Sequence, residues 1–288
     1  MTRSRASTHA AFLLVAAGTA IGIAGTDLVL PAIPSLPAVL GGTAERAQLV
    51  LAARKAANLA SVAQACREAQ AQVLVVPTDV SDPAQCRALI EQAVQQFGGI
   101  DTLINNAGVS AHALFSDVRS EDLHWYESVM RTNFWGSVWC THAALPHLQA
   151  RRGRIVAVSS LAGLVGVPGR TAYSASKFAM NGFFEALRAE LKPQGVSVTL
   201  AYPGVVDTRI RYHGYNARGE AAGRSGLKED GAKPVAECAR LILAGMQHRQ
   251  REVVMTTRGK LGRWLKLLAP GVVERMVLAA LQDDVQPR

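Results

Sequence analysis

The residues best suited to chemistry in this sequence are Tyr173 and Lys177, which stand four positions apart. Side chains at that spacing are neighbours on one face of a helix. A phenol, with a pKa of about 10, exchanges protons poorly at neutral pH unless its ionised form is stabilised, and an adjacent ammonium stabilises that form. The hydroxyl of Ser160, thirteen residues earlier, could bond a substrate oxygen as charge develops on it. The pair alone also fits a solvent-facing helix surface, because about 0.1 such pairs are expected by chance.

The elements that would position these residues follow from short apolar runs that alternate with longer segments of helical period, beginning near Leu49. This alternation is typical of repeated βαβ units. We therefore expect an α/β fold with a Rossmann-like, doubly wound parallel sheet in three layers, α/β/α. The expected strands are 49–53, 72–77, 102–105, 154–158, 197–202 and 252–255, and the expected helices are 55–69, 83–97, 121–149, 172–193 and 234–247. Parallel strands hold ligands beyond their carboxyl ends, where Asn105–Gly108 and Ser160 stand.

Taken in order, these motifs resemble those of a known family. Asn105–Gly108, Asn133 in Thr-Asn-Phe-Trp-Gly, Ser160, the Tyr173–Lys177 pair and Pro203–Thr208 are similar to short-chain dehydrogenase/reductase motifs over about residues 49–250. The resemblance implies hydride transfer between a nicotinamide dinucleotide and an alcohol or carbonyl, with Asn133, Ser160, Tyr173 and Lys177 as catalytic residues. It also implies cofactor contacts from Asp79, Val80, Asn106, Ala107, Gly108, Tyr173, Lys177, Pro203, Gly204, Val206 and Thr208. A homodimer is expected.

The choice between the two nicotinamide cofactors rests on Arg54, at the end of the strand predicted over 49–53. In the family that the sequence resembles, a basic residue there meets the 2′-phosphate of NADP, and an acidic residue bonds the ribose of NAD. We therefore expect NADP in preference to NAD. The alternative is that Arg54 and Lys55 form a solvated helix start.

The segment upstream of Leu49 departs from this pattern, and we treat residues 1–48 as an atypical apolar segment before a domain over 49–288. Gly18 and Gly22 follow a strand-like run at 12–16 and partly match a glycine-rich phosphate loop, so they are candidate cofactor contacts. In contrast, residues 25–37 and on to about 51 resemble the first transmembrane helix of major-facilitator drug exporters. Pro31, Pro34 and Pro37 also exclude a regular soluble helix there. One hypothesis is therefore a fusion or frameshift hybrid whose first βαβ unit is replaced.

Composition narrows the remaining function classes. The net charge of +9 comes from scattered Lys and Arg residues that are not interleaved with aromatics, so nucleic-acid binding is not expected. The cysteines stand singly without metal-type spacing, which predicts no metal site and free thiols in a reducing cytoplasm. Arginines in 209–233 form a basic flap over the substrate, either solvated or suited to an acidic ligand.

Two readings of the whole chain remain open at this point. The first is an NADP-dependent oxidoreductase that uses a Ser-Tyr-Lys(-Asn) mechanism. The second is a catalytically impaired, membrane-tethered remnant that binds cofactor poorly. A membrane surface could be met by the N-terminal segment or by a basic amphipathic helix near Lys260–Leu268, although that helix could equally pack on the domain or on a second subunit.

Overall fold

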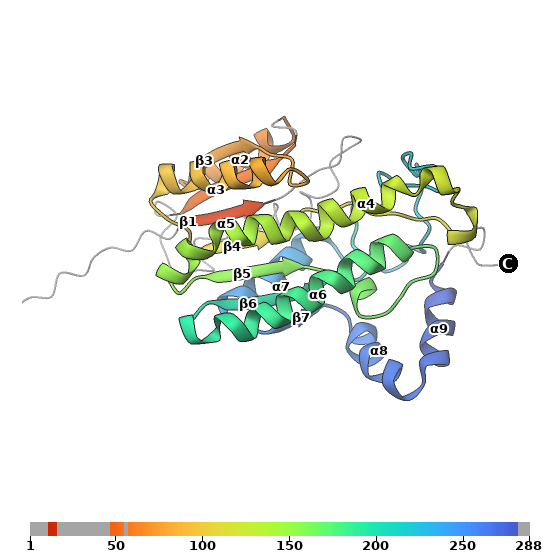
Figure 1. The fold of residues 1–288 in the computed structure, drawn as a ribbon. Helices are drawn as coiled ribbons and strands as arrows, with labels where there is room; N and C mark the ends of the chain where they lie inside the picture. Colours follow the sequence, from red (N-terminus) through yellow and green to blue (C-terminus); the bar gives the residue numbers. More distant parts are fainter. Residues whose placement is uncertain (1–10, 16–46, 55–56, 282–288) are drawn as a thin grey trace, which may run out of the picture.

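The computed structural model describes residues 11–15, 47–54 and 57–281. Within these ranges, parallel strands form a seven-stranded sheet in the order β3-β2-β1-β4-β5-β6-β7 (Figure 1). The strands are β1 (Ala11–Val15), β2 (Gln48–Ala53), β3 (Gln72–Pro77), β4 (Thr102–Asn105), β5 (Arg154–Val158), β6 (Ser197–Tyr202) and β7 (Glu252–Val254). This order, with a crossover on each side of β1, is that of a doubly wound Rossmann-like fold and confirms the expected fold class.

Helices cover both faces of the sheet because its central strands are apolar on both sides. One core cluster joins β2 to α2 (Ala57–Glu68) and α7 (Val235–Gln247). The other joins the sheet to α3 (Pro83–Phe97), α5 (Gly136–Ala150) and α6 (Thr171–Leu191). All four residues of β4 are buried, as parallel strands between two helical layers require. The layers are therefore α/β/α.

The first strand is present in the structure. β1 pairs with β2 on one side and with β4 on the other, in parallel register from Ala11↔Gln48 and from Phe12↔Thr102. Residues 11–15 therefore supply a strand in the middle of the sheet, and the hypothesis of a fusion or frameshift origin for the N-terminal segment stays a hypothesis. Gly18, Gly22 and the transporter-like run 25–37 lie outside the described residues.

The predicted helix over 121–149 is divided in the structure. Glu121 belongs to a short 3-10 turn (Ser120–Asp122), α4 spans His124–Met130, a π-helical turn spans Arg131–Trp135, and α5 follows. Apolar periodicity does not distinguish these forms, because a π turn adds one residue without ending the helix. The other predicted helices and strands agree with the observed bounds to within two residues.

Two helices close the described chain. α8 (Thr257–Leu268) is capped by Thr256, whose hydroxyl accepts a hydrogen bond from the Gly259 amide, and α9 (Pro270–Ala279) begins at Pro270. The expected C-terminal amphipathic helix is therefore formed. Among the described residues, none of the helices is both long enough and apolar enough to cross a bilayer. The four cysteines are buried free thiols, as predicted.

Candidate active site

Tyr173 and Lys177 lie in the first two turns of α6, buried at the carboxyl end of the sheet. The Lys177 ammonium is 5.8 Å from the centroid of the Tyr173 ring and donates a hydrogen bond of 2.8 Å to the carbonyl of Val158, the last residue of β5. Ser160 follows that strand two residues later, and its hydroxyl accepts from the Ala162 amide. The three side chains that spacing alone suggested therefore meet where β5 ends.

Arg170 adds a second cation to this group. Its guanidinium carbon lies 4.2 Å from the centroid of the Tyr173 ring, and its Nη2 donates a 2.6 Å hydrogen bond to the Ser110 hydroxyl. The side chain is buried. Arg170 was not among the residues predicted from the sequence, although its position one turn before Tyr173 is a signal that could have found it.

These neighbours decide the proton affinity of the phenol. Burial alone would raise the pKa of Tyr173, but the positive charges of Lys177 and Arg170 and a hydrogen bond with the Ser160 hydroxyl lower that pKa below its ordinary value. Burial lowers the pKa of Lys177, while Tyr173 raises it and Arg170 lowers it further. The arrangement favours an ionisable phenol, which is the property required of a proton-transfer group.

Asn133 sits in the π-helical turn and is fully buried. Its Oδ1 accepts from the Val109 amide at 2.7 Å, and its Nδ2 donates to the Val109 carbonyl at 3.0 Å and to the Ser176 hydroxyl at 2.9 Å. A Cβ added at Gly108 would lie 3.3 Å from Asn133 Oδ1 and 3.7 Å from Lys177 Nζ. Asn133 therefore fixes the loop after β4 against α6, directly beside the Lys177 ammonium.

A cavity of about 320 Å³ brings most of the predicted site residues together. The predicted residues that line it are Asn106, Gly108, Ser160, Tyr173, Lys177, Pro203, Gly204, Val206 and Thr208. Its lining is mainly apolar, with contributions from the flap (residues 209–233), α8 and α9. The α8 and α9 contributions were not predicted, because nearly a hundred residues separate these helices from Tyr173 in the sequence.

Other predicted cofactor contacts lie elsewhere along the same edge of the sheet. Arg54 and Asp79 follow the neighbouring strands β2 and β3, and Arg54 Nη1 is 4.0 Å from Asp79 Oδ2. Burial lowers the pKa of Arg54, whereas Asp79 raises it. Val80 and Ala107 are buried and do not line the cavity. The structure thus places Arg54 and Asp79 next to each other, outside the cavity that holds Tyr173.

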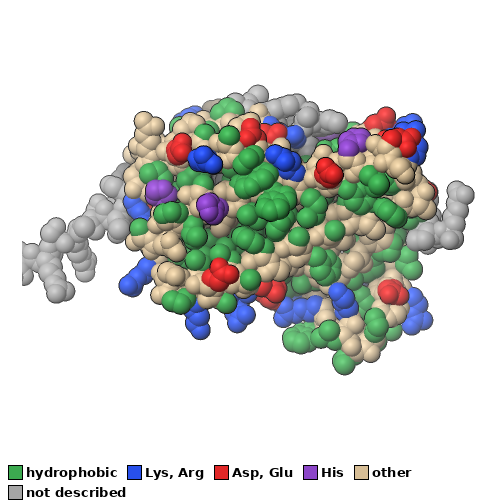
Figure 2. Space-filling view, in the orientation of Figure 1, with side chains coloured by type: hydrophobic (Ala, Val, Ile, Leu, Met, Phe, Trp, Pro, Cys, Tyr) green, Lys and Arg blue, Asp and Glu red, His purple; other side chains and the backbone are tan. Residues whose placement is uncertain are grey.

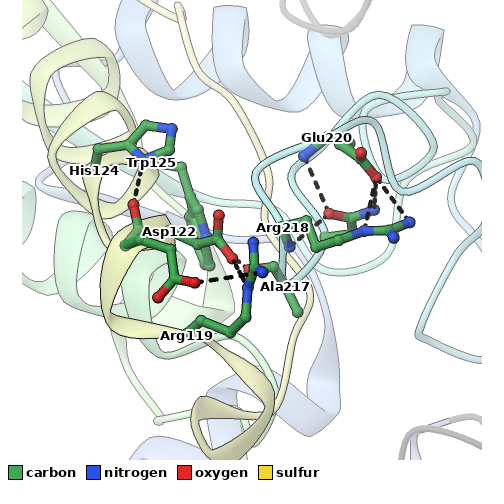
Figure 3. Close-up of polar contacts among 9 residues, drawn as sticks. Arg119, Asp122, His124, Trp125, Ala217, Arg218 and Glu220 are labelled. Carbon is green, nitrogen blue, oxygen red and sulfur yellow. Dashed lines mark hydrogen bonds and ion pairs between the residues drawn. The ribbon is translucent and has the colours of Figure 1, made fainter.

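The flap over the cavity is anchored by specific contacts. Arg211 is buried, pairs with Glu229 at 2.6 Å and donates to the Val206 carbonyl, so the expectation of a wholly solvated basic flap is wrong for this residue. Arg218 fits that expectation because it is exposed beside Glu220 (Figure 3). The same view shows the Trp125 indole, which donates to the Ala217 carbonyl at 3.3 Å. Arg211 also lines the cavity, where its charge is shared with the Glu229 carboxylate.

Comparisons with known proteins identify the family of the chain. The family model described as short chain dehydrogenase matches residues 39–217. The chain is 36% identical over 233 residues to 11-beta-hydroxysteroid dehydrogenase 1A of Arabidopsis thaliana, covering 78% of this chain and 66% of that protein. It is 35% identical over 230 residues to 11-beta-hydroxysteroid dehydrogenase-like 4A of the same plant, covering 78% and 73%. The chain belongs to the short-chain dehydrogenase/reductase family.

Solved structures show the same fold. A short chain dehydrogenase/reductase from Burkholderia phymatum in complex with NAD has a TM-score of 0.72 at 24% identity, covering 92% of this chain and 95% of that one. An alcohol dehydrogenase from Thermococcus sibiricus complexed with 5-hydroxy-NADP has a TM-score of 0.65 at 18% identity, covering 85% and 95%. The relatives named here are dehydrogenases and give no support to the transporter resemblance. The family match from residue 39 also overlaps the segment assigned to it.

Proposed function

We propose that this protein is an NADP-dependent oxidoreductase that interconverts an apolar alcohol and the corresponding carbonyl compound through Ser160, Tyr173, Lys177 and Asn133. The observation that carries the proposal is the buried Tyr173 phenol, whose pKa is lowered by the charges of Lys177 and Arg170 at the wall of a mainly apolar cavity. The hydroxysteroid dehydrogenase relatives favour the same substrate class. The chain spans about two thirds of the length of the first of these relatives.

The residues around the cavity suit the nicotinamide half of a dinucleotide. Gly108 and Gly204 both line the cavity where neighbouring groups approach closely: an added Cβ would lie 3.3 Å from Asn133 Oδ1 at Gly108 and 3.1 Å from Thr256 Cγ2 at Gly204. When bound, the nicotinamide would supply or accept the hydride. Asn106, Gly108 and the loop over 203–208 are the groups that would hold it against the cavity wall.

The chain's own residues account for the proton. In carbonyl reduction the Tyr173 hydroxyl gives its proton to the substrate oxygen, and in alcohol oxidation the phenolate takes it back. The Ser160 hydroxyl donates a hydrogen bond to the same oxygen and stabilises its developing charge. The Lys177 ammonium stabilises the phenolate, and Asn133 keeps the loop over 106–109 in register with α6.

The decisive variant is Tyr173→Phe, assayed by NADPH oxidation against a panel of hydroxysteroids and cyclic ketones. Loss of the proton-transfer group should lower kcat by a factor of about 10² to 10⁴ with NADPH binding retained. Tyr126→Phe is the matched control, because the Tyr126 hydroxyl bonds Thr171 and not the cavity. Lys177→Ala should be nearly as severe as Tyr173→Phe. A Tyr173→Phe enzyme within a few-fold of an active parent would refute the mechanism.

The preference for NADP is proposed to rest on Arg54, whose guanidinium can meet a 2′-phosphate with paired hydrogen bonds. Charge-assisted hydrogen bonds of about 1.5–3 kcal/mol imply that Arg54→Asp weakens NADPH binding about 10- to 100-fold, with NADH much less affected. Arg67→Asp, on the outer surface of α2, is the matched control. Tighter binding of NADH than of NADPH by the parent protein would contradict this proposal.

Gly18 and Gly22 are proposed to contact the pyrophosphate. They follow β1, which lies where the strand order reverses, and ligands of such sheets bind beyond that strand. Gly18→Val and Gly22→Val should each abolish NADPH binding in a calorimetric titration. Unchanged binding by both variants would remove these glycines from the proposed site. Absence of NADPH binding by the parent protein would favour the remnant hypothesis, which the central position of β1 disfavours.

A homodimer is proposed through the outer face of α5 and α6. Trp135 and Trp139 stack at 5.8 Å between ring centroids, and Trp135 and Phe178 are exposed. Figure 2 shows hydrophobic side chains gathered on this face, over α5. Light scattering of Trp135→Glu should report a smaller mass than that of the parent. Equal masses would remove this face from the proposed interface.

A further inference from the structure

Six of the ten exposed large apolar side chains of the described residues lie on α8 and α9. We define the C-terminal apolar surface as Leu261, Trp264, Leu267, Leu268, Val272 and Met276. The first four, all on α8, are 60–86% exposed. Figure 2 shows hydrophobic side chains projecting at the lower edge of the molecule, where α8 lies in Figure 1, with Lys and Arg side chains beside them. Contiguous apolar surface of this kind marks an interaction site.

The inner side of α8 is already occupied, so these side chains cannot turn inward. Gly259 packs on Leu161, because an added Cβ would lie 2.5 Å from Leu161 Cδ2. Arg263 pairs with Glu252, and Lys266 donates to the Leu164 carbonyl at 3.1 Å. The helix is held by its small and basic residues, and four of its five large apolar residues are exposed.

The charges around this surface favour one occupant. α8 carries four basic residues and no acidic one: Arg258, Lys260, Arg263 and Lys266. Pairing with Glu252 neutralises Arg263, and Arg258 lines the cavity, which leaves Lys260 and Lys266. On α9 the exposed Glu274 and Arg275 balance each other, so the surface as a whole stays positively charged. A second copy of the chain would bring the same positive charge to the contact, whereas an anionic bilayer complements it. Trp264 among leucines has the amphipathic character of side chains that settle at the headgroup level.

We propose that the C-terminal apolar surface binds an anionic lipid bilayer, with α8 lying in the plane of the membrane interface. Leu261, Trp264 and Leu268 insert below the headgroups, and Lys260 stays among the phosphates. The proposal does not depend on catalysis. Its consequence for substrate does rest on the proposed function: Gly262 of α8 and Val273, Met276 and Val277 of α9 also line the cavity, so an apolar substrate would reach the cavity from lipid.

The test is flotation of the full chain with vesicles of phosphatidylcholine alone or with about 30% phosphatidylglycerol. We expect binding to the anionic vesicles that weakens as salt rises, and little binding to neutral ones. Trp264→Ser/Leu268→Ser should reduce the bound fraction at least tenfold. Phe115→Ser/Leu123→Ser, which removes an exposed apolar pair elsewhere, should not change it. Lys260→Glu should weaken binding to anionic vesicles only.

Quenching of tryptophan fluorescence distinguishes lipid contact through the C-terminal apolar surface from lipid contact through another part of the protein. With brominated lipids in the vesicles, the parent should show tryptophan quenching that Trp264→Phe loses while still floating. Equal binding by Trp264→Ser/Leu268→Ser and the parent would overturn the proposal, as would absence of binding to anionic vesicles. A further outcome is that the parent does not bind vesicles and that Trp264→Ser/Leu268→Ser halves the mass measured by light scattering. That result would assign the surface to a second copy of the chain and would also overturn the proposal.

Discussion

Removing the positive charge of Arg170 should change the pH dependence of the reaction. Arg170→Met keeps much of the length of the side chain but deletes the guanidinium 4.2 Å from the Tyr173 ring centroid. Two unit charges about 4 Å apart interact by roughly 4 kcal/mol at an effective dielectric constant near 20. The guanidinium charge is spread over several atoms and the phenolate oxygen lies beyond the ring centre. We therefore expect about half of that energy, roughly 2 kcal/mol, which corresponds to a loss of about 30-fold in kcat at neutral pH.

The direction of the pH effect follows from the sign of the charge. Arg170 lowers the pKa of Tyr173, so its removal raises that pKa. Alcohol oxidation requires the phenolate, and its rate should therefore begin to rise at higher pH in Arg170→Met than in the parent. Arg170 also lowers the pKa of Lys177, so its removal raises that pKa and favours the charged ammonium. The ammonium stabilises the phenolate and offsets part of the stabilisation lost with Arg170.

The assay is the pH profile of kcat/KM for alcohol oxidation, measured for Arg170→Met, Arg170→Lys and Arg131→Met. Arg170→Lys retains the charge and should keep the profile near that of the parent. Arg131 also stacks on an aromatic ring, that of Trp139, but lies outside the cavity, so Arg131→Met controls for the loss of such a contact. Thermal unfolding of each variant reports the loss of the hydrogen bond to Ser110 separately. An unchanged profile in a folded Arg170→Met enzyme would refute the electrostatic role.

Three further predictions concern the support of the site. Asn133→Ala leaves the buried amide and carbonyl of Val109 without Asn133 and removes one of the two hydrogen bonds of the Ser176 hydroxyl. The variant should lose activity and cost about 2–4 kcal/mol in denaturant unfolding, and a cost below about 1 kcal/mol would contradict the role given to Asn133. Gly136→Ala places a Cβ 2.8 Å from Val80 Cγ2 and should destabilise the protein by about 1–3 kcal/mol. Gly182→Ala on α6 is the control, because its Cβ meets nothing within 4 Å, and it should be neutral or stabilising. Equal melting temperatures of the two variants would contradict the packing argument. Glu229→Gln removes the negative charge that pairs with the buried Arg211 and holds the flap over the cavity. The variant should raise KM with little change in kcat, at a stability cost of about 1 kcal/mol. An unaltered KM would show that the flap does not depend on this pair.

The sequence was sufficient to predict the strands and those site residues whose positions follow from local spacing. Strands such as Arg154–Val158 are continuous apolar runs, and the positions of Ser160, Tyr173 and Lys177 relative to them follow from spacing on one strand end and one helix face. The cavity then brings these residues to Asn106 and the loop over 203–208, as the carboxyl ends of parallel strands predict.

Features that depend on tertiary contacts were not predictable in the same way. The buried state of Arg211 depends on Glu229, eighteen residues away, and an arginine in a basic run gives no local sign of such a partner. The cavity wall formed by Met276 and its neighbours depends on how α8 and α9 fold back over the site. The position of β1 could not be deduced from its apolar run, because the same run also fits the start of a membrane helix.

The π-helical turn at Arg131–Trp135 decides how this part of the chain responds to the loss of a residue. A residue in a regular helix advances the side-chain direction by about 100°, so a one-residue deletion elsewhere in α4 or α5 would rotate the helix beyond it by that angle. A π turn already holds one residue more than an α-helical turn, so a deletion at 131–135 would return it to α-helical form and leave Cys140, Ala144 and Leu148 facing the core. The same deletion would displace Asn133 from Val109. Single-codon deletions at 131–135 should therefore lower activity more than folding. A library of one-residue deletions along α4 and α5 would locate the turn as the place where folded protein survives deletion.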